Sequence, residues 1–341
     1  MIKDLWRPII LSSALFFPSW NGTILHAFFE KKLNLPISCK IGKTCWLVNL
    51  VDLDPSNKVL DYTCNNQSYD GHKGTDIRIR NFKEMKKGIP VLAVSSGVVK
   101  GMRDGEKDNI SNYIPAVRVK GKECGNGVVL THGDGWETQY CHLKKRSVTV
   151  RIGEEVKRGQ KLGLVGMSGF TEFPHLHFSI RNKGRVVDPF VGKARGSGCS
   201  PSKLSLWEPK VLKDLIKPLT AIYDGGFSSS IPKKHKILLG FENEKYILKK
   251  DKALILWVLV NRPIENSLLN FEIFGPQNEL IFTHKIKVNK NQANKLYYSG
   301  KKKRQTHDWK AGIYTGKIIL SFPKRDGRIF KQAVVVKGRV D

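Results

Sequence analysis

Short runs of alternating or β-branched residues, separated by glycines, dominate the chain between residues 39 and 199. Such runs are typical of strands, because side chains alternate between the two faces of a sheet. The clearest runs are residues 76–80, 91–100, 128–131 and 136–142. In residues 150–166 glycines separate short apolar pieces about every six residues, which favours tightly turned strands over helices. We therefore predict a β-sheet domain over residues 39–199.

The Gly- and Ser-rich residues 196–202 are the strongest boundary signal in the chain. Beyond them, further short strands are predicted at residues 237–240, 246–249, 253–260, 269–274, 280–288, 312–322 and 330–336. Several short strands at this spacing indicate a β-sandwich. The predicted fold class is therefore all-β: an antiparallel sheet domain, a linker at residues 200–219 and an Ig-like β-sandwich at residues 220–341.

The first thirty residues have the form of an export signal. Lys3 and Arg7 precede the apolar residues 9–17, and no charge follows until Glu30. A basic start before a short apolar stretch is typical of a secretory signal. The cleavage site is poor and the uncharged stretch is long enough to span a membrane, so an uncleaved anchor and a buried core helix stay open as alternatives. We expect an exported protein, either periplasmic or anchored in the inner membrane, in preference to a secreted one.

Charge is the outlier in an otherwise globular composition of 341 residues, with 40% apolar and 26% charged residues. The chain has 59 Lys and Arg residues against 30 Asp and Glu residues, a formal net charge of +29. Residues 201–341 hold 28 of the basic and 12 of the acidic residues, so 16 of the excess positive charges lie there. The basic residues 301–304 are expected to form a solvated loop. Such a surface attracts polyanions, and export makes an anionic envelope surface the expected partner and not nucleic acid.

The six cysteines all lie beyond the predicted signal, at positions 39, 45, 64, 124, 141 and 199. An even number of cysteines in an exported chain suggests disulfides. Cys39 and Cys45 are close enough to close a local loop, and we predict this pair first. Zinc binding by thiols is the competing interpretation, but the chain has no Cys-x-x-Cys pair.

Two histidine motifs are candidates for a functional site. His72 and Asp76 are four residues apart, so they can share one side of a strand or helix, and Gly74 between them allows a close approach. In a strand, His175 and His177 share one face while Leu176, Phe178 and Ile180 share the other. Imidazole and carboxylate together suit zinc. Taken separately, a His–Asp hydrogen bond and a pair of surface histidines are the alternatives.

Two further segments accompany these motifs. Alternation over residues 136–142 places Trp136, Thr138, Tyr140 and His142 on one face, whereas His132 is interpreted as structural. The glycine-rich residues 163–169 form a loop that would let a substrate backbone lie close. A phosphate-binding loop is disfavoured, because the Gly-x-x-x-x-Gly-Lys-Ser/Thr pattern is missing.

The chain contains His72-x-x-x-Asp76, then Tyr140-x-His142, and then the glycine-rich segment before Pro-His175-Leu-His177-Phe. Together these motifs resemble those of the lysostaphin/LytM-type zinc endopeptidases that cut peptidoglycan peptides. The resemblance covers about residues 60–190. It implies one Zn²⁺ per chain, held by His72, Asp76 and His177, with water in the fourth position. It also implies that His142 and His175 act as general base and transition-state stabiliser.

The resemblance implies further expectations around the site. Tyr140 and Tyr69 are candidates for the substrate groove, with Tyr62 a weaker one. Cys64 and Cys141 lie beside motif residues, so we expect a disulfide that braces the site, with free buried thiols as the alternative.

The expected function is hydrolysis of peptide bonds in peptidoglycan stem peptides or cross-links. The alternative is a non-catalytic, envelope-bound regulator of other wall hydrolases with the same fold, although such regulators usually lack a ligand and all five positions are filled here. Residues 153–163 are similar to a biotinyl carrier hairpin, but the lysine that such carriers modify is missing.

Overall fold

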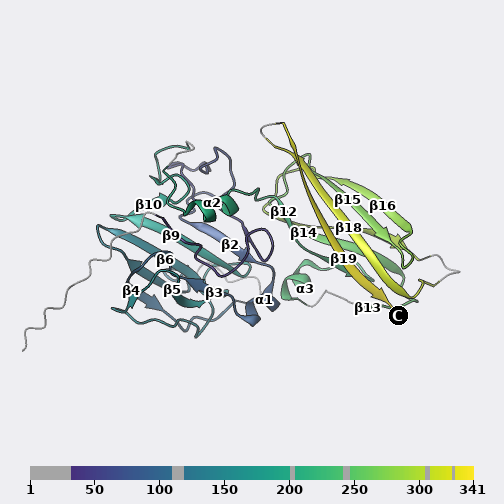
Figure 1. Ribbon diagram of the computed structural model, residues 1–341, viewed down its shortest axis with the longest axis horizontal. Coiled ribbons are helices and arrows are strands. Elements are labelled where there is room, and N and C mark those ends of the chain that lie inside the picture. Colours follow the sequence, from purple (N-terminus) through teal and green to yellow (C-terminus); the bar gives the residue numbers. More distant parts are fainter. Residues whose placement is uncertain (1–31, 110–118, 200–203, 241–245, 304–307, 325–326) are drawn as a thin grey trace, which may run out of the picture.

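The computed structural model describes residues 32–109, 119–199, 204–240, 246–303, 308–324 and 327–341. Figure 1 shows two bodies side by side, one with the purple-to-teal strands and one with the green-to-yellow strands. The predicted export segment, residues 1–30, lies outside the described residues. Among the described helices, none combines the length and the apolar character needed to cross a membrane.

The first body is built on a nine-stranded sheet with strand order β1-β2-β9-β6-β5-β4-β7; off this path, β10 pairs with β9 and β11 pairs with β10. Its pairs are antiparallel, as predicted. The short strands β3 and β8 form a separate antiparallel pair. The strands are β1 Cys45–Leu47, β2 Thr75–Ile79, β3 Pro90–Leu92, β4 Gly97–Arg103, β5 Asn126–Thr131, β6 Trp136–Leu143, β7 Glu155–Val156, β8 Lys161–Leu164, β9 His175–Asn182, β10 Arg185–Asp188 and β11 Lys193–Ala194.

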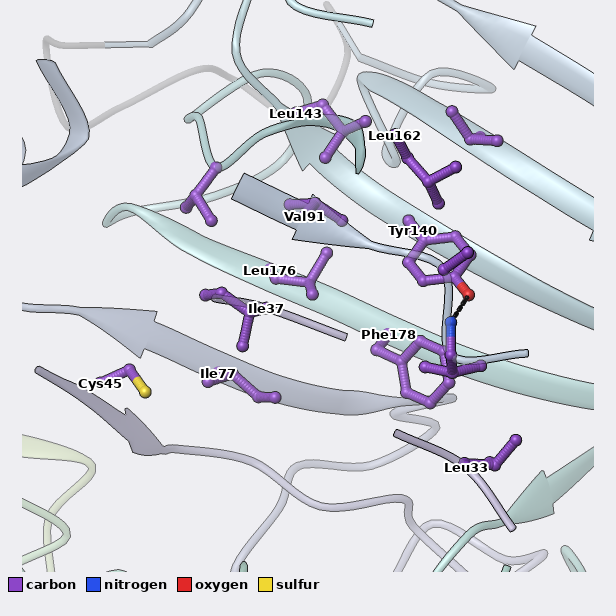
Figure 2. Packing of buried hydrophobic residues seen from close by; sticks show 14 of the residues in the cluster. Leu33, Ile37, Cys45, Ile77, Val91, Tyr140, Leu143, Leu162, Leu176 and Phe178 are labelled. Atoms are coloured by element: carbon purple, nitrogen blue, oxygen red, sulfur yellow. Dashed lines mark hydrogen bonds between the residues drawn. The ribbon is translucent and has the colours of Figure 1, made fainter. Parts of the chain in front are cut away.

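The core of this body lies on the apolar face of β9 and its neighbours. Leu176 and Phe178 point into it beside Ile77 of β2 and Val91 of β3, as Figure 2 shows. The odd-numbered positions of β9 face away from this core, which the alternation of the sequence predicted. A buried apolar face therefore holds β9 in the register that presents His175 and His177 on the other side.

The described part of the predicted linker, residues 204–219, packs on the first body. Leu206, Trp207, Leu215 and Leu219 are buried in the same hydrophobic cluster as β9. Helix α2, Pro209–Leu215, lies within this segment and begins with a proline, which is well suited to the first turn of a helix. The segment is therefore packed chain and not a free linker, because its apolar residues complete the core.

The second body is a pair of facing sheets. One has the order β12-β14-β17 and the other β13-β19-β18-β15-β16. The strands are β12 Ala221–Ser228, β13 Tyr246–Ile247, β14 Ala253–Asn261, β15 Leu268–Phe274, β16 Leu280–Lys287, β17 Asn294–Lys302, β18 Gly312–Pro323 and β19 Ile329–Val340. Their inward side chains, among them Leu256, Phe271 and Ile318, form one hydrophobic cluster. The predicted β-sandwich is thus confirmed.

Several predictions for the second body are wrong in detail. Residues 237–240, expected as a strand, belong to helix α3, Lys234–Leu239, which ends at Gly240 in a left-handed conformation. Strands β12 and β17 were missed, since β12 contains an Asp-Gly-Gly sequence that is typical of a turn and β17 is rich in polar residues. The lysines at 301 and 302 end β17 instead of lying in a loop.

The two bodies meet along β1, the edge strand of the first sheet. Trp46 of β1 packs in a hydrophobic cluster with Tyr223, Trp257 and Ile237 of the second body. Asn261 donates to the carbonyl of Leu47 at 2.8 Å. Strand β14 is therefore buried on both faces, by the sandwich core and by the first body, which explains its unbroken apolar run.

Candidate metal site and catalytic cleft

Strands β2 and β9 place the three predicted metal ligands together. Asp76 and His177 are cross-strand partners in the antiparallel pair. The Nδ1 atom of His177 lies 2.8 Å from Oδ1 of Asp76, and Nε2 of His72 lies 3.2 Å from the same oxygen. The two imidazole nitrogens are 3.1 Å apart. Three donor atoms thus converge on one point, from residues up to 105 positions apart in sequence.

Neighbouring groups orient these donors. The Nδ1 atom of His72 faces the carbonyl of Leu50 at 2.7 Å, so Nδ1 carries the proton and Nε2 presents its lone pair. The side chain of Asn49 donates to Oδ2 of Asp76 at 2.7 Å, which leaves Oδ1 for a metal. Tetrahedral zinc with bonds of about 2.0–2.1 Å needs ligand atoms about 3.3 Å apart. The donor set therefore fits zinc in both chemistry and spacing.

The electrostatics of the cluster favour an ionised carboxylate. Burial would raise the pKa of the Asp76 carboxyl, but His72, His175 and His177 outweigh it and hold this pKa well below its usual range. Burial would also lower the pKa of His72, yet the adjacent Asp76 raises it above the ordinary value. A carboxylate that is already ionised is ready to bind a cation.

His142 reaches the site through a break in the strand alternation. Its backbone has a φ of 62°, a left-handed conformation that is uncommon outside glycine. The β5–β6 register shifts beside it, between Asn126 and Val128. This irregularity turns His142 to the face opposite Tyr140, although both sit at even positions of β6. The predicted grouping of these two residues on one face is therefore wrong.

His142 and His175 lie side by side next to the three ligands. Their ring centroids are 4.6 Å apart, and that of His142 is 6.0 Å from that of His177. Nδ1 of His142 faces the carbonyl of Ser168 at 2.8 Å, and Nδ1 of His175 faces the carbonyl of Phe173 at 2.9 Å. Both Nδ1 atoms therefore carry protons, and both Nε2 atoms are left as proton acceptors. Burial, above all, lowers the pKa of His142 well below its ordinary value.

Residues 70–189, which include all five of these residues, match Peptidase family M23. The chain carries an M23 peptidase domain. Among its relatives, an uncharacterized metalloprotease of Haemophilus influenzae is 32% identical over 126 residues, which cover 37% of this chain and 22% of that protein. The peptidoglycan DD-endopeptidase ShyA of Vibrio cholerae is 33% identical over 132 residues, which cover 39% of this chain and 25% of that protein. The chain therefore spans at most about a quarter of the length of these two relatives.

Two further similarities concern the same domain. The cell division protein DipM of Caulobacter vibrioides is 35% identical over 108 residues, which cover 30% of this chain and 16% of that protein. The solved catalytic domain of the antimicrobial peptidase lysostaphin from Staphylococcus simulans is 26% identical, with 41% of this chain and 85% of that chain covered and a TM-score of 0.25.

The structure distinguishes the three tyrosine candidates of the first body. Tyr69 lines the cleft beside the ligands, and its ring centroid lies 4.6 Å from that of His72. Tyr140 is instead buried in the core next to Phe178, where its hydroxyl accepts a hydrogen bond from the backbone N–H of Val94 (Figure 2). Tyr140 is therefore a structural residue and not part of the groove. Tyr62 is likewise excluded, because it stacks on Phe190.

The glycines of the M23 motifs make room for protein and not for substrate backbone. A Cβ on Gly74 would lie 2.7 Å from the ring of His177. A Cβ on Gly166 would lie 2.3 Å from the backbone nitrogen of Lys144, and one on Gly169 would meet the backbone of Glu123. Residues 163–169 are therefore packed against neighbouring chain, which corrects the expectation of a substrate-binding loop.

The cysteines form three disulfides. Cys39–Cys45 is the pair predicted first. Cys64 and Cys141 are both bonded, but to Cys199 and Cys124 and not to each other. The Cys124–Cys141 bond does brace the site, because the carbonyl of Cys124 accepts the backbone N–H of His142 at 2.8 Å.

The residues that close the cleft could not be identified from any pattern in the sequence. The cleft has a volume of about 450 Å³, and the second body contributes to its wall. The missed residues are Asn49 and Arg78 of the first body, and Lys234, Arg262 and Asn294 of the sandwich. Only the pairing of the two bodies brings the last three to the site.

Proposed function

We propose that this chain is a zinc-dependent endopeptidase that hydrolyses peptide bonds in peptidoglycan stem peptides or cross-links. The observation that carries the proposal is the convergence of His72, Asp76 and His177 on one point, with the Nε2 atoms of His142 and His175 beside it. The peptidoglycan substrate is suggested by relatives such as ShyA, whose name states DD-endopeptidase activity.

Each residue has a defined task in this mechanism. His72, Asp76 and His177 would hold the zinc ion. A zinc ion held there would lower the pKa of a bound water to about 7 and would act as a Lewis acid on the scissile carbonyl. His142 accepts the proton of the attacking water at Nε2, since its Nδ1–H is already committed to the Ser168 carbonyl. The resulting imidazolium then returns the proton to the leaving amine.

His175 is proposed to stabilise the charge that develops on the carbonyl oxygen. For this role it must be an imidazolium with a proton on Nε2 as well as on Nδ1, because only an N–H can donate to an oxyanion. Its Nδ1 is held by the Phe173 carbonyl and by the hydroxyl of Thr171, at 2.9 and 3.0 Å. The ring is thus locked with Nε2 towards the ligands, 3.7 Å from Oδ1 of Asp76. A preorganised group of this kind costs no rearrangement when charge appears in the reaction.

Digestion of cell-wall sacculi tests the proposal. Zinc-loaded protein without residues 1–30 should release peptides that mass spectrometry of the products identifies, and a chelator should stop the release. The His142→Ala variant should bind zinc but lose activity by at least about 100-fold, as expected for loss of a general base. Intact sacculi with zinc-loaded wild-type protein would reject the enzyme and favour the envelope-bound regulator.

We also propose that the protein is exported to the periplasm or anchored in the inner membrane. Three disulfides support an oxidising compartment. The basic sandwich is proposed to attach the enzyme to an anionic envelope surface. Binding of the full chain to sacculi or anionic vesicles should then weaken steeply with salt, and salt-independent binding would contradict this role.

A further inference from the structure

The cleft of the M23 domain has a second wall that belongs to the sandwich. Arg262 follows β14 and donates to the carbonyl of Val48 at 2.9 Å and to the side chain of Asn49. Helix α3 adds Lys234 and Leu238 to the lining of the cleft. Substrate that reaches the metal site from this end must therefore fit against residues of both bodies.

Arg78 lies on the floor of this end of the cleft. It is the cross-strand partner of His175, just as Asp76 is the partner of His177. Arg78 lies two positions after Asp76 on the same face of the strand, a distance of about 6.5–7 Å along it. A group bound at Arg78 would thus lie one or two peptide residues from a carbonyl at the metal.

The guanidinium of Arg78 is buried without hydrogen-bond acceptors. Its carbon lies 3.7 Å from the ring centroid of Tyr223 and 4.7 Å from that of Phe173. The side chain is 0% exposed, and none of its three nitrogens makes a hydrogen bond of acceptable geometry to a described residue. Burial lowers the pKa of the Arg78 guanidinium, and Tyr223, through its charge and its hydroxyl, and the nearby Asp224 offset this only in part. Buried donors without acceptors are costly, so a ligand that supplies oxygen atoms would gain by meeting them.

Two more cations border the same end of the cleft. Arg262 uses its donors on backbone carbonyls and the Asn49 amide, so it forms no ion pair with a described carboxylate. Lys234 is exposed, and Glu172 is the acid that acts on it from across the cleft. Besides Glu172, the acidic group in the lining is Asp76, which is committed to the metal. Within the lining, three cations therefore face one acid that is not a predicted metal ligand, while Asp224 and Asp61 act on Arg78 and Arg262 from outside it.

We propose that Arg78, with Lys234 and Arg262 beside it, forms a subsite for a carboxylate of the peptide substrate. The planar guanidinium matches a carboxylate in a bidentate geometry, and the two rings already hold it flat. The enzyme accordingly selects peptides that carry a free carboxylate within one or two residues of the scissile bond. This inference rests on the proposed peptidase function for its substrate class, and a binding measurement can test it without turnover.

The test uses the zinc-loaded His142→Ala protein, so that a bound peptide stays intact. The probes are N-acetyl-lysyl-D-alanyl-D-alanine as the free acid and as the C-terminal amide, with affinities measured by calorimetry. We expect the acid to bind at least about tenfold more tightly, since hydrogen bonds to charged groups are the stronger ones. In the same background, Arg78→Met should bring the ratio of the two affinities close to one, and Arg78→Lys should restore part of it.

Matched variants of helix α3 keep the test decisive if Arg78→Met fails to fold. Lys234→Met should lower the acid preference, whereas Lys236→Met, on the same helix but outside the cleft lining, should leave it unchanged. Three results would each overturn the subsite. They are equal binding of the acid and the amide, an acid preference that survives both Arg78→Met and Lys234→Met, and no binding of either peptide. An acid preference together with intact sacculi would support the subsite and reject the proposed cleavage.

Discussion

Asn49 is expected to control zinc affinity without touching the metal. Its amide donates to Oδ2 of Asp76 at 2.7 Å, while its carbonyl oxygen accepts from Arg262 of the sandwich. Replacing it in Asn49→Ala leaves a buried carboxylate oxygen without its donor and frees Asp76 to rotate. Loss of such an outer partner costs about 10–100-fold in metal affinity, which is about 1.4–2.8 kcal/mol.

Competition with a chromogenic chelator measures this affinity directly and needs no turnover. Arg262→Met should shift the affinity in the same direction by a smaller factor, because it acts through Asn49. Asn182→Ala is the matched control, since Asn182 ends β9 and its amide contacts only the exposed carbonyl of Asp134. Unchanged zinc affinity in a folded Asn49→Ala protein would refute the idea that this amide fixes the ligand.

Three further outcomes follow from packing and burial. Gly74→Ala should lower zinc affinity at least about tenfold and destabilise the fold by about 1–3 kcal/mol. The reason is that its Cβ would lie 2.7 Å from the ring of His177. Gly101→Ala is the control, because its Cβ meets nothing within 4 Å, and it should be near neutral in the same chelator and thermal-unfolding assays. Burial raises the pKa of Asp188 to about 7 from 3.8, so the folded state holds this proton longer than the unfolded state and stability falls as pH rises from about 4 to 7. Asp188→Asn should therefore lose less thermal stability than the wild type between pH 5 and pH 8, and parallel curves would contradict this origin. Replacing both Cys124 and Cys141 with Ala should cost about 3 kcal/mol in the free energy of unfolding, measured by denaturant titration. It should also lower activity, measured by sacculus digestion. A loss of stability with full activity would show that this disulfide does not brace the site.

Several features of the M23 domain could be predicted from local patterns in the sequence. The alternation of residues 175–180 predicted which face of β9 packs in the core and which face carries the histidines. Burial of Leu176 and Phe178 confirms it, because an apolar face can be buried in only one register. The separation of His72 from Asp76 by four residues likewise predicted that they would meet.

Other features depend on the tertiary structure and could not be predicted from the alternation of residues. Tyr140 and His142 should share a face by period, but a left-handed residue and a register shift send them to opposite sides. The partners of Cys64 and Cys141 depend on loops that only the fold brings together.

The second wall of the cleft is the largest contribution of the tertiary structure. Arg78 looks like an ordinary polar residue in an alternating strand, and Arg262 lies 184 positions further along the chain. They border one cavity because β14 covers the edge strand β1 and buries Trp46. Local spacing and periodicity in the sequence thus indicated that His72 lies near Asp76 and that His175 and His177 share one face. Contacts between the two bodies, which have no periodic pattern in the sequence, determined which residues lie beside them.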